Sequence, residues 1–123
     1  MYDIELVREV LNNILWSINQ ILRRSENFNS YEQFLDNDYG LEKLDSICMQ
    51  LINIGEALKE IDKLTGGSLL LRYPEVDWTN AKGMRDIITH HYFDIDAEIV
   101  FAVIKDKLPQ MKEVIKQILN SID

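Results

Sequence analysis

The sequence predicts a single all-α domain, built as an antiparallel bundle of about four to five helices. Three long segments carry apolar residues at steps of three and four positions, which is the repeat of one helix face. No stretch shows a convincing alternation of apolar and polar residues, which would indicate a half-buried strand. The 123 residues, 46% of them hydrophobic, fit one domain over positions 1–123. Because three apolar stripes must be buried against one another, a bundle follows.

The first helix is predicted in the N-terminal segment and ends at "NFNS", residues 27–30. Its apolar stripe consists of Ile4, Val7, Leu11, Ile14, Ile18 and Ile21. The segment "YEQFLDNDYG" that follows, residues 31–40, leaves room for one short helical turn before the second helix begins.

The second helix is predicted to end at "LTGG", residues 64–67, where a glycine is available for a left-handed cap. Its stripe consists of Leu44, Ile47, Leu51, Ile54, Leu58 and Ile61. Gly55 lies inside this helix and costs about 1 kcal/mol relative to alanine. We therefore expect a neighbouring helix to approach closely at Gly55.

A connection, "RYPEVDWTN" at residues 72–80, separates this helix from a shorter one predicted from about 78 to 90. Pro74 disfavours helix before it, and either Asp77 or Thr79 can cap the helix that follows. The last helix begins after Asp94 or Asp96. Its stripe consists of Ile104, Leu108, Met111, Ile115, Ile118 and Ile122. Pro109 lies inside this pattern and predicts a kink in the C-terminal helix.

Composition excludes several classes of protein. No run of eighteen apolar residues is present, so no membrane span is expected. The N-terminus, "MYDIELVREV", carries acids where a signal peptide carries bases, which predicts a cytoplasmic protein. A lone cysteine, Cys48, excludes an internal disulfide and is interpreted as a buried, inert thiol.

The net charge of −8 argues against a general electrostatic attraction to nucleic acid, but this charge is unevenly distributed. Residues 26–62 hold nine acids and two bases, whereas residues 72–92 hold three of each. The acidic segment is either a solvated face or a docking surface for a basic partner, and both interpretations remain open.

The stretch "MRDIITHHYFDID", residues 84–96, contains both histidines of the chain. On one continuous helix, Arg85 and Tyr92 would share a face, and Asp86 could orient the ring of His90 four residues later. Arg85 and His90 would point about 140° apart. Either the helix ends near His90, or a second chain supplies the complementary group across a symmetric contact.

Arginine and histidine together suit phosphodiester cleavage without a metal. An imidazole can take the proton of a ribose 2′-hydroxyl, and a guanidinium can stabilise the charge that develops on the phosphate. This chemistry needs RNA, because DNA lacks the 2′-hydroxyl. No metal or cofactor is expected, because adjacent histidines diverge on a helix and neither an HExxH motif nor a glycine-rich phosphate loop is present.

The spacing Arg85, His90, Tyr92 spells R-x4-H-x-Y, which resembles the signature of the HepT-like branch of the HEPN superfamily. Further segments resemble the family in the same order, over roughly residues 30–120. They are "INIGEALKE" at 52–60, "YPEVDW" at 73–78, "GMRDIITHHYFDID" at 83–96 and "KLPQMKEVIKQI" at 107–118.

This resemblance implies a HEPN-like helical bundle that forms a homodimer, with the two signatures facing each other. It implies a metal-independent endoribonuclease acting on an RNA such as tRNA or mRNA, as the toxin of a toxin–antitoxin pair. Arg85 and His90 would be catalytic. Tyr92 would receive AMP from an MntA-like nucleotidyltransferase antitoxin, and the added phosphodiester would repel RNA.

Two positions qualify the resemblance. The family often has asparagine after the arginine, where this chain has Asp86, whose charge either weakens phosphate binding or raises the pKa of His90. His91 lies outside the signature and is assigned a supporting role at most. The alternative function is a non-catalytic helical partner that holds nucleotide or substrate for a nucleotidyltransferase, and a plain dimeric scaffold is a third interpretation.

Overall fold

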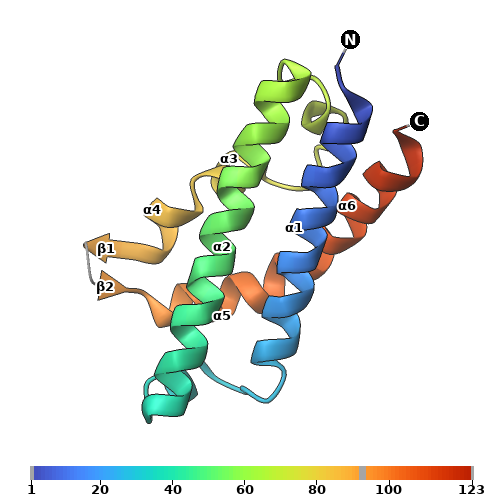
Figure 1. The fold of residues 1–123 in the computed structure, drawn as a ribbon. Coiled ribbons are helices and arrows are strands. Elements are labelled where there is room, and N and C mark those ends of the chain that lie inside the picture. Colours follow the sequence, from blue (N-terminus) through green and yellow to red (C-terminus); the bar gives the residue numbers. More distant parts are fainter. Residues whose placement is uncertain (1, 92–93, 123) are drawn as a thin grey trace.

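The fold is a bundle of α-helices, as the sequence predicts (Figure 1). A computed structural model describes residues 2–91 and 94–122, with only the backbone of residues 90 and 91. Two long helices, α1 (Ile4–Ser25) and α2 (Asp38–Thr65), run antiparallel side by side. The C-terminal helices α5 (Ala97–Asp106) and α6 (Leu108–Ser121) pack against α1. Short 3-10 turns lie at Tyr31–Phe34 and Leu70–Arg72.

The predicted apolar stripes form one shared core. Every stripe residue is buried except Ile4, which begins α1 and is 37% exposed. Phe34, from the 3-10 turn between α1 and α2, is fully buried and stacks on Phe28, with ring centroids 4.5 Å apart. The single cysteine, Cys48, is buried in the same core, as predicted.

Polar side chains cap the N-termini of the two long helices, and a glycine ends the second. The Asp3 carboxylate accepts a hydrogen bond from the Leu6 amide, and the Asn37 side chain accepts one from the Gly40 amide. Gly66 ends α2 with φ +64°, which is the predicted left-handed cap.

Gly55 lies where a neighbouring helix comes close, as expected. A Cβ atom at this position would lie 3.0 Å from the carbonyl oxygen of Ala81 and 3.2 Å from that of Lys82. Both carbonyls belong to α3 (Trp78–Lys82). The absence of a side chain at Gly55 therefore sets how closely α3 approaches α2.

The prediction of a single helix from 78 to 90 is wrong. The chain forms α3, then α4 (Met84–Ile88), with a break at Gly83. A two-stranded antiparallel hairpin follows, made by β1 (Thr89–His91) and β2 (Asp94–Ile95). The expectation that no strand would form fails here, because strands of three and two residues are too short to show an alternating pattern.

The bend predicted at Pro109 is present as a break between two helices. Helix α5 ends at Asp106, and α6 begins at Leu108 with the proline in its first turn. A proline is tolerated there because the first turn of a helix has unpaired amides in any case. No helix in the described ranges is long and apolar enough to cross a membrane.

Candidate functional site

The signature arginine lies on α4, a helix whose orientation is fixed by its apolar side. Met84 and Ile88 are buried, so Arg85 and Asp86 are turned outward and are exposed. Neither side chain makes a hydrogen bond or ion pair within the part of the chain that the structure describes. The guanidinium of Arg85 is therefore available to an anionic ligand.

Helix α4 ends at Ile88 because Thr89 takes an extended conformation, with φ −122° and ψ 135°. The hydroxyl of Thr89 donates to the carbonyl oxygen of Arg85 at 2.6 Å. This bond satisfies one of the carbonyls that a helix C-terminus leaves without a partner. The same residue, β-branched and suited to a strand, begins β1.

Asp96 closes the base of the β1–β2 hairpin and begins the next helix. Its backbone N–H donates to the carbonyl oxygen of Ile88 at 2.7 Å. Its carboxylate accepts from the amide of Ile99 at 3.0 Å, as the N-cap of α5. The hairpin is thus held between the end of α4 and the start of α5, and Asp96 is the cap that the sequence offered as one of two choices.

Helix α3 anchors this region to α2. The Asp77 carboxylate accepts from the Asn80 amide at 3.1 Å, which confirms it as the N-cap. The indole N–H of buried Trp78 donates to the Tyr73 carbonyl at 2.8 Å. Lys82 forms an ion pair with Asp62 of α2. Sequence reasoning missed this pair, because nothing local indicates a partner twenty residues away.

The remaining signature residues are only partly placed. His90 lies in β1, and the backbone of His91 pairs with that of Asp94. Tyr92 lies outside the described residues, as do the side chains of both histidines. Asp86 and His90 do not share one helix face, which was expected only if a single helix ran through both, because the extended Thr89 ends α4 between them. The helix end near His90, offered as one solution to the 140° divergence, is confirmed.

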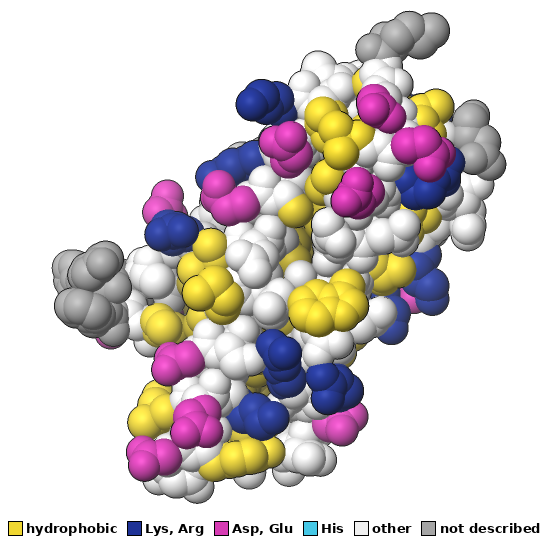
Figure 2. Space-filling view, viewed as in Figure 1, with side chains coloured by type: hydrophobic (Ala, Val, Ile, Leu, Met, Phe, Trp, Pro, Cys, Tyr) yellow, Lys and Arg dark blue, Asp and Glu magenta, His cyan; other side chains and the backbone are white. Residues whose placement is uncertain are grey.

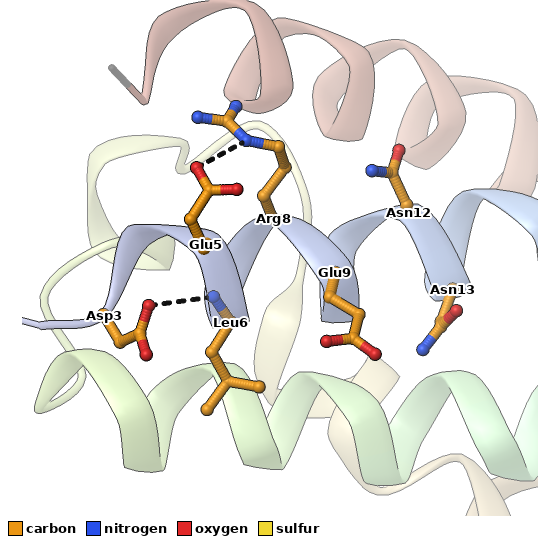
Figure 3. Close-up of a pocket in the computed structure, with 7 residues that line it drawn as sticks. All are labelled: Asp3, Glu5, Leu6, Arg8, Glu9, Asn12 and Asn13. Carbon is orange, nitrogen blue, oxygen red and sulfur yellow. Dashed lines mark hydrogen bonds and ion pairs between the residues drawn. The ribbon is translucent and has the colours of Figure 1, made fainter.

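A hollow of about 580 Å³ lies elsewhere, along the N-terminal half of α1 (Figure 3). Three carboxylates line it, those of Asp3, Glu5 and Glu9. Its one cation, Arg8, lies 3.6 Å from the Glu5 carboxylate. This hollow is acidic and contains no signature residue, so it does not suit a phosphate-bearing ligand.

Comparison with known proteins adds the family. The model described as "Ribonuclease HepT-like" matches residues 14–118, which include the whole R-x4-H-x-Y signature. The chain belongs to the HepT-like family. HepT-like proteins are part of the HEPN superfamily, and the observed all-helical bundle agrees with this membership.

Relatives of this HepT-like chain come from archaea and bacteria. Two proteins of Methanocaldococcus jannaschii with "RNase" in their names are 29% and 28% identical to it. Each alignment covers 95% of this chain and 90% of the relative. A protein of Thermococcus cleftensis with "ribonuclease HepT" in its name is 32% identical over 59 residues, 48% of this chain and 50% of the relative. No solved structure matches the chain significantly.

Proposed function

We propose that this HepT-like protein is a metal-independent endoribonuclease, the toxin of a toxin–antitoxin pair. The observation that carries the proposal is the R-x4-H-x-Y signature inside a family match over residues 14–118. The ribonuclease names of its relatives support it. So does the exposed, unpartnered guanidinium of Arg85, five residues before His90.

In the proposed reaction His90 acts as the general base. Its imidazole takes the proton of a ribose 2′-hydroxyl, and the oxygen attacks the adjacent phosphorus. The bond from phosphorus to the 5′-oxygen breaks, leaving a 2′,3′-cyclic phosphate on one fragment and a 5′-hydroxyl on the other. The leaving 5′-oxygen takes a proton from water, and the imidazolium of His90 returns its proton to the solvent, so atoms and charge balance. Arg85 stabilises the extra negative charge on the phosphoryl oxygens with its fixed fork of donors.

The proposal includes a homodimer in which two signatures face each other, and an MntA-like nucleotidyltransferase as the antitoxin. AMP transferred to Tyr92 would add a negative phosphodiester and a bulky base beside Arg85 and His90. An RNA phosphate would then be repelled and sterically blocked, which explains neutralisation without proteolysis. His91 is proposed to support RNA binding, and Asp86 to act through its negative charge beside Arg85 and His90; neither takes part in bond breaking.

The test is cleavage of total RNA, including tRNA, by the purified protein in EDTA. We expect His90→Ala to lower the rate by roughly 10²–10⁴-fold, the usual contribution of a general acid or base. Arg85→Ala should lower it by about 10²–10³-fold, as the loss of an electrostatic stabiliser does. His91→Ala should change the rate only a few-fold. Lys116→Gln on α6, distant in sequence from the signature, controls for a loss of charge.

Intact mass measured on the same samples separates the alternatives. Cleavage that survives His90→Ala would contradict the catalytic assignment. An uncleaved substrate together with an AMP-sized mass increase would identify the neutralised toxin. An uncleaved substrate with no added mass, and with binding of nucleotide or of a nucleotidyltransferase retained, would favour the non-catalytic helical partner instead.

A further inference from the structure

A tryptophan is exposed where α1 and α2 pack against each other, far along the chain from the signature. Trp16 is 54% exposed on α1, and Met49 is 58% exposed on α2. The other tryptophan, Trp78, is 8% exposed and hydrogen-bonded. The indole of Trp16, which lies largely in water, therefore offers an apolar ring face on which a ligand can stack.

Beside Trp16 the surface is hollowed by about 290 Å³ between the two helices. Asn13 of α1 and Asn53 of α2 line this hollow together with the Trp16 ring. Two further lining residues are joined by a hydrogen bond, which the Ser17 hydroxyl donates to the Gln50 side chain at 2.8 Å. Both asparagine side chains are exposed, and neither has a partner in the described chain. We call this feature the Trp16 hollow.

Three cations, Arg23, Arg24 and Lys43, lie on α1 and α2 further along the same two helices, and we call them the basic strip. Their contacts are all with neutral groups: Arg23 donates to Gln20, Arg24 to the Ser46 hydroxyl at 2.8 Å, and the Lys43 ammonium lies 5.4 Å from the Tyr39 ring centroid. Figure 2 shows dark-blue side chains over the lower part of these helices, with magenta side chains beside them.

The two arginines of the basic strip lie in a part of α1 without acids, whereas Lys43 lies between Glu42 and Asp45 in the acidic segment 26–62. Elsewhere Lys59, Lys82 and Lys116 are paired with carboxylates. No acidic residue occurs between positions 10 and 25 of α1. The Debye length is about 8–10 Å at physiological salt, so a ligand here responds to the local charge more than to the net charge of −8.

We infer that the Trp16 hollow and the basic strip together bind single-stranded RNA, as a guiding surface for the substrate. One base stacks on the Trp16 ring, with its edge against the asparagine amides, and the flanking phosphates lie on Arg23, Arg24 and Lys43. Stacking on an exposed ring beside a line of cations is how proteins hold single strands without sequence readout. This inference rests on the proposed ribonuclease function and names the surface that holds the RNA substrate outside the cleavage site.

This guiding surface leads to the signature. Helix α2 lies between α1 and α4 (Figure 1) and packs against both. An α-helix is about 10 Å across, so the width of α2 separates α1, which carries Arg23 and Arg24, from α4, which carries Arg85. A single-stranded RNA of a few nucleotides is long enough to cross that width. One RNA molecule therefore contacts the Trp16 hollow and the basic strip with its flanking nucleotides while its cleavage site lies at Arg85.

A second copy of the chain fits this surface less well. In a two-fold contact centred on the strip, the same patch faces itself. The three cations of one copy would then oppose the three of the other, with no carboxylate among their contacts to offset the repulsion. A single-stranded RNA, which is a polyanion, meets no such repulsion from the three cations.

The test is binding of a fluorescein-labelled 2′-O-methyl oligouridylate of about a dozen nucleotides, within the site sizes known for single-strand binders. The 2′-O-methyl groups prevent cleavage, so affinity is measured separately from catalysis. Arg23→Gln with Arg24→Gln should weaken binding about tenfold. The slope of log affinity against log salt should become shallower by roughly 1.4, because each single-strand phosphate contact contributes about 0.7.

A charge-matched control is available on α6. Lys112→Gln with Lys116→Gln lowers the net charge by the same two units and should leave both affinity and slope nearly unchanged. Equal losses in the two double variants would overturn the inference, because they would show attraction to net charge and not to the strip.

Trp16 supplies an independent readout. Its fluorescence should be quenched by the oligonucleotide, whereas Trp78 is buried and should not respond. Trp16→Ala should weaken binding about tenfold, and Trp16→Phe should keep most of the affinity because a ring remains for stacking. If Trp16→Ala instead converts a dimer to a monomer in light scattering and leaves affinity intact, the surface is a contact between copies and the inference fails.

The outcome is separable from that of the proposed function. Oligonucleotide binding that depends on Trp16 and the arginines, without cleavage of natural RNA, would support the RNA-binding surface and contradict the proposed ribonuclease activity. Cleavage and oligonucleotide binding that are both unchanged by these substitutions would support the ribonuclease activity and contradict the RNA-binding surface.

Discussion

At the scale of single residues, Cys48 shows how burial controls chemistry. Burial, and secondarily the charge of Asp45, raises the pKa of its thiol from 9.0 to about 12. Since the thiolate is the reactive species, we expect no reaction with Ellman's reagent in the folded protein at about pH 8. One thiol should react once the chain is unfolded in guanidinium chloride. Rapid labelling of the folded protein would contradict the buried position.

The same group sets a pH dependence of stability. Its pKa is higher in the folded chain than the ordinary value of 9.0, so the folded state holds the proton more tightly. The resulting stabilisation is complete below pH 9.0 and is lost as the pH rises towards 12. Cys48→Ala should therefore flatten the decline in the free energy of unfolding above pH 9.0, measured by denaturant titration against the parent chain.

Residues whose roles are local were predictable from the sequence. Asp77 and Asp96 cap helices because a short acidic side chain precedes an apolar run, and Gly66 ends α2 because glycine accepts positive φ. The ion pair between Lys82 and Asp62 was not predictable, because it depends on how α3 lies against α2. For the signature, the residue types indicate the chemistry, but only the fold decides that Arg85 is exposed.

At the scale of elements, the break at Gly83 decides how the site is presented. The N–H of Gly83 donates to the carbonyls of Thr79 and Asn80, which ends α3 and lets α4 start in a new direction. The glycine in "AKGMRD" was a usable signal for this break. The hairpin that follows carried no comparable signal, because its strands are too short for a period of two to appear.

Helix α3 gives a test at this scale. Asp77→Ala removes the side chain that accepts from the Asn80 amide, and should lower the free energy of unfolding by about 1 kcal/mol. The melting temperature should fall by roughly 4 °C for a chain of this size. Asp77→Asn retains an accepting oxygen and should lose much less. Equal losses for alanine and asparagine would show that the charge matters and not the cap.

The contact at Gly55 gives a second test. Gly55→Ala gains about 1 kcal/mol in helix propensity, but the new methyl would lie 3.0 Å from the Ala81 carbonyl oxygen. Lys82, held to Asp62, restricts any retreat of α3. We expect a net loss of about 1–3 kcal/mol in thermal unfolding, as overpacked cores show. A stabilised variant would mean that α3 moves away freely.

At the scale of the whole molecule, the proposed homodimer predicts complementation between two inactive variants. If each site takes Arg85 from one copy and His90 from the other, mixed dimers of Arg85→Ala and His90→Ala contain one complete site. After unfolding and refolding an equal mixture, about a quarter of the wild-type cleavage rate should return, because half of the dimers are mixed. No recovery in dimers verified by light scattering would place both residues of a site in the same copy.

The base of the hairpin has a consequence for how such a protein can change over evolutionary time. Asp96 joins the end of α4 to the start of α5 through its own amide and carboxylate. The contact between these two helices therefore does not depend on the tip of the hairpin. The described strand residues contribute nothing to the fully buried core. Substitution of the exposed Asp94 should therefore cost little stability, whereas Ile95 packs against the core and Thr89 bonds to the end of α4. The outer surface of the hairpin can change at such exposed positions while the scaffold stays constant.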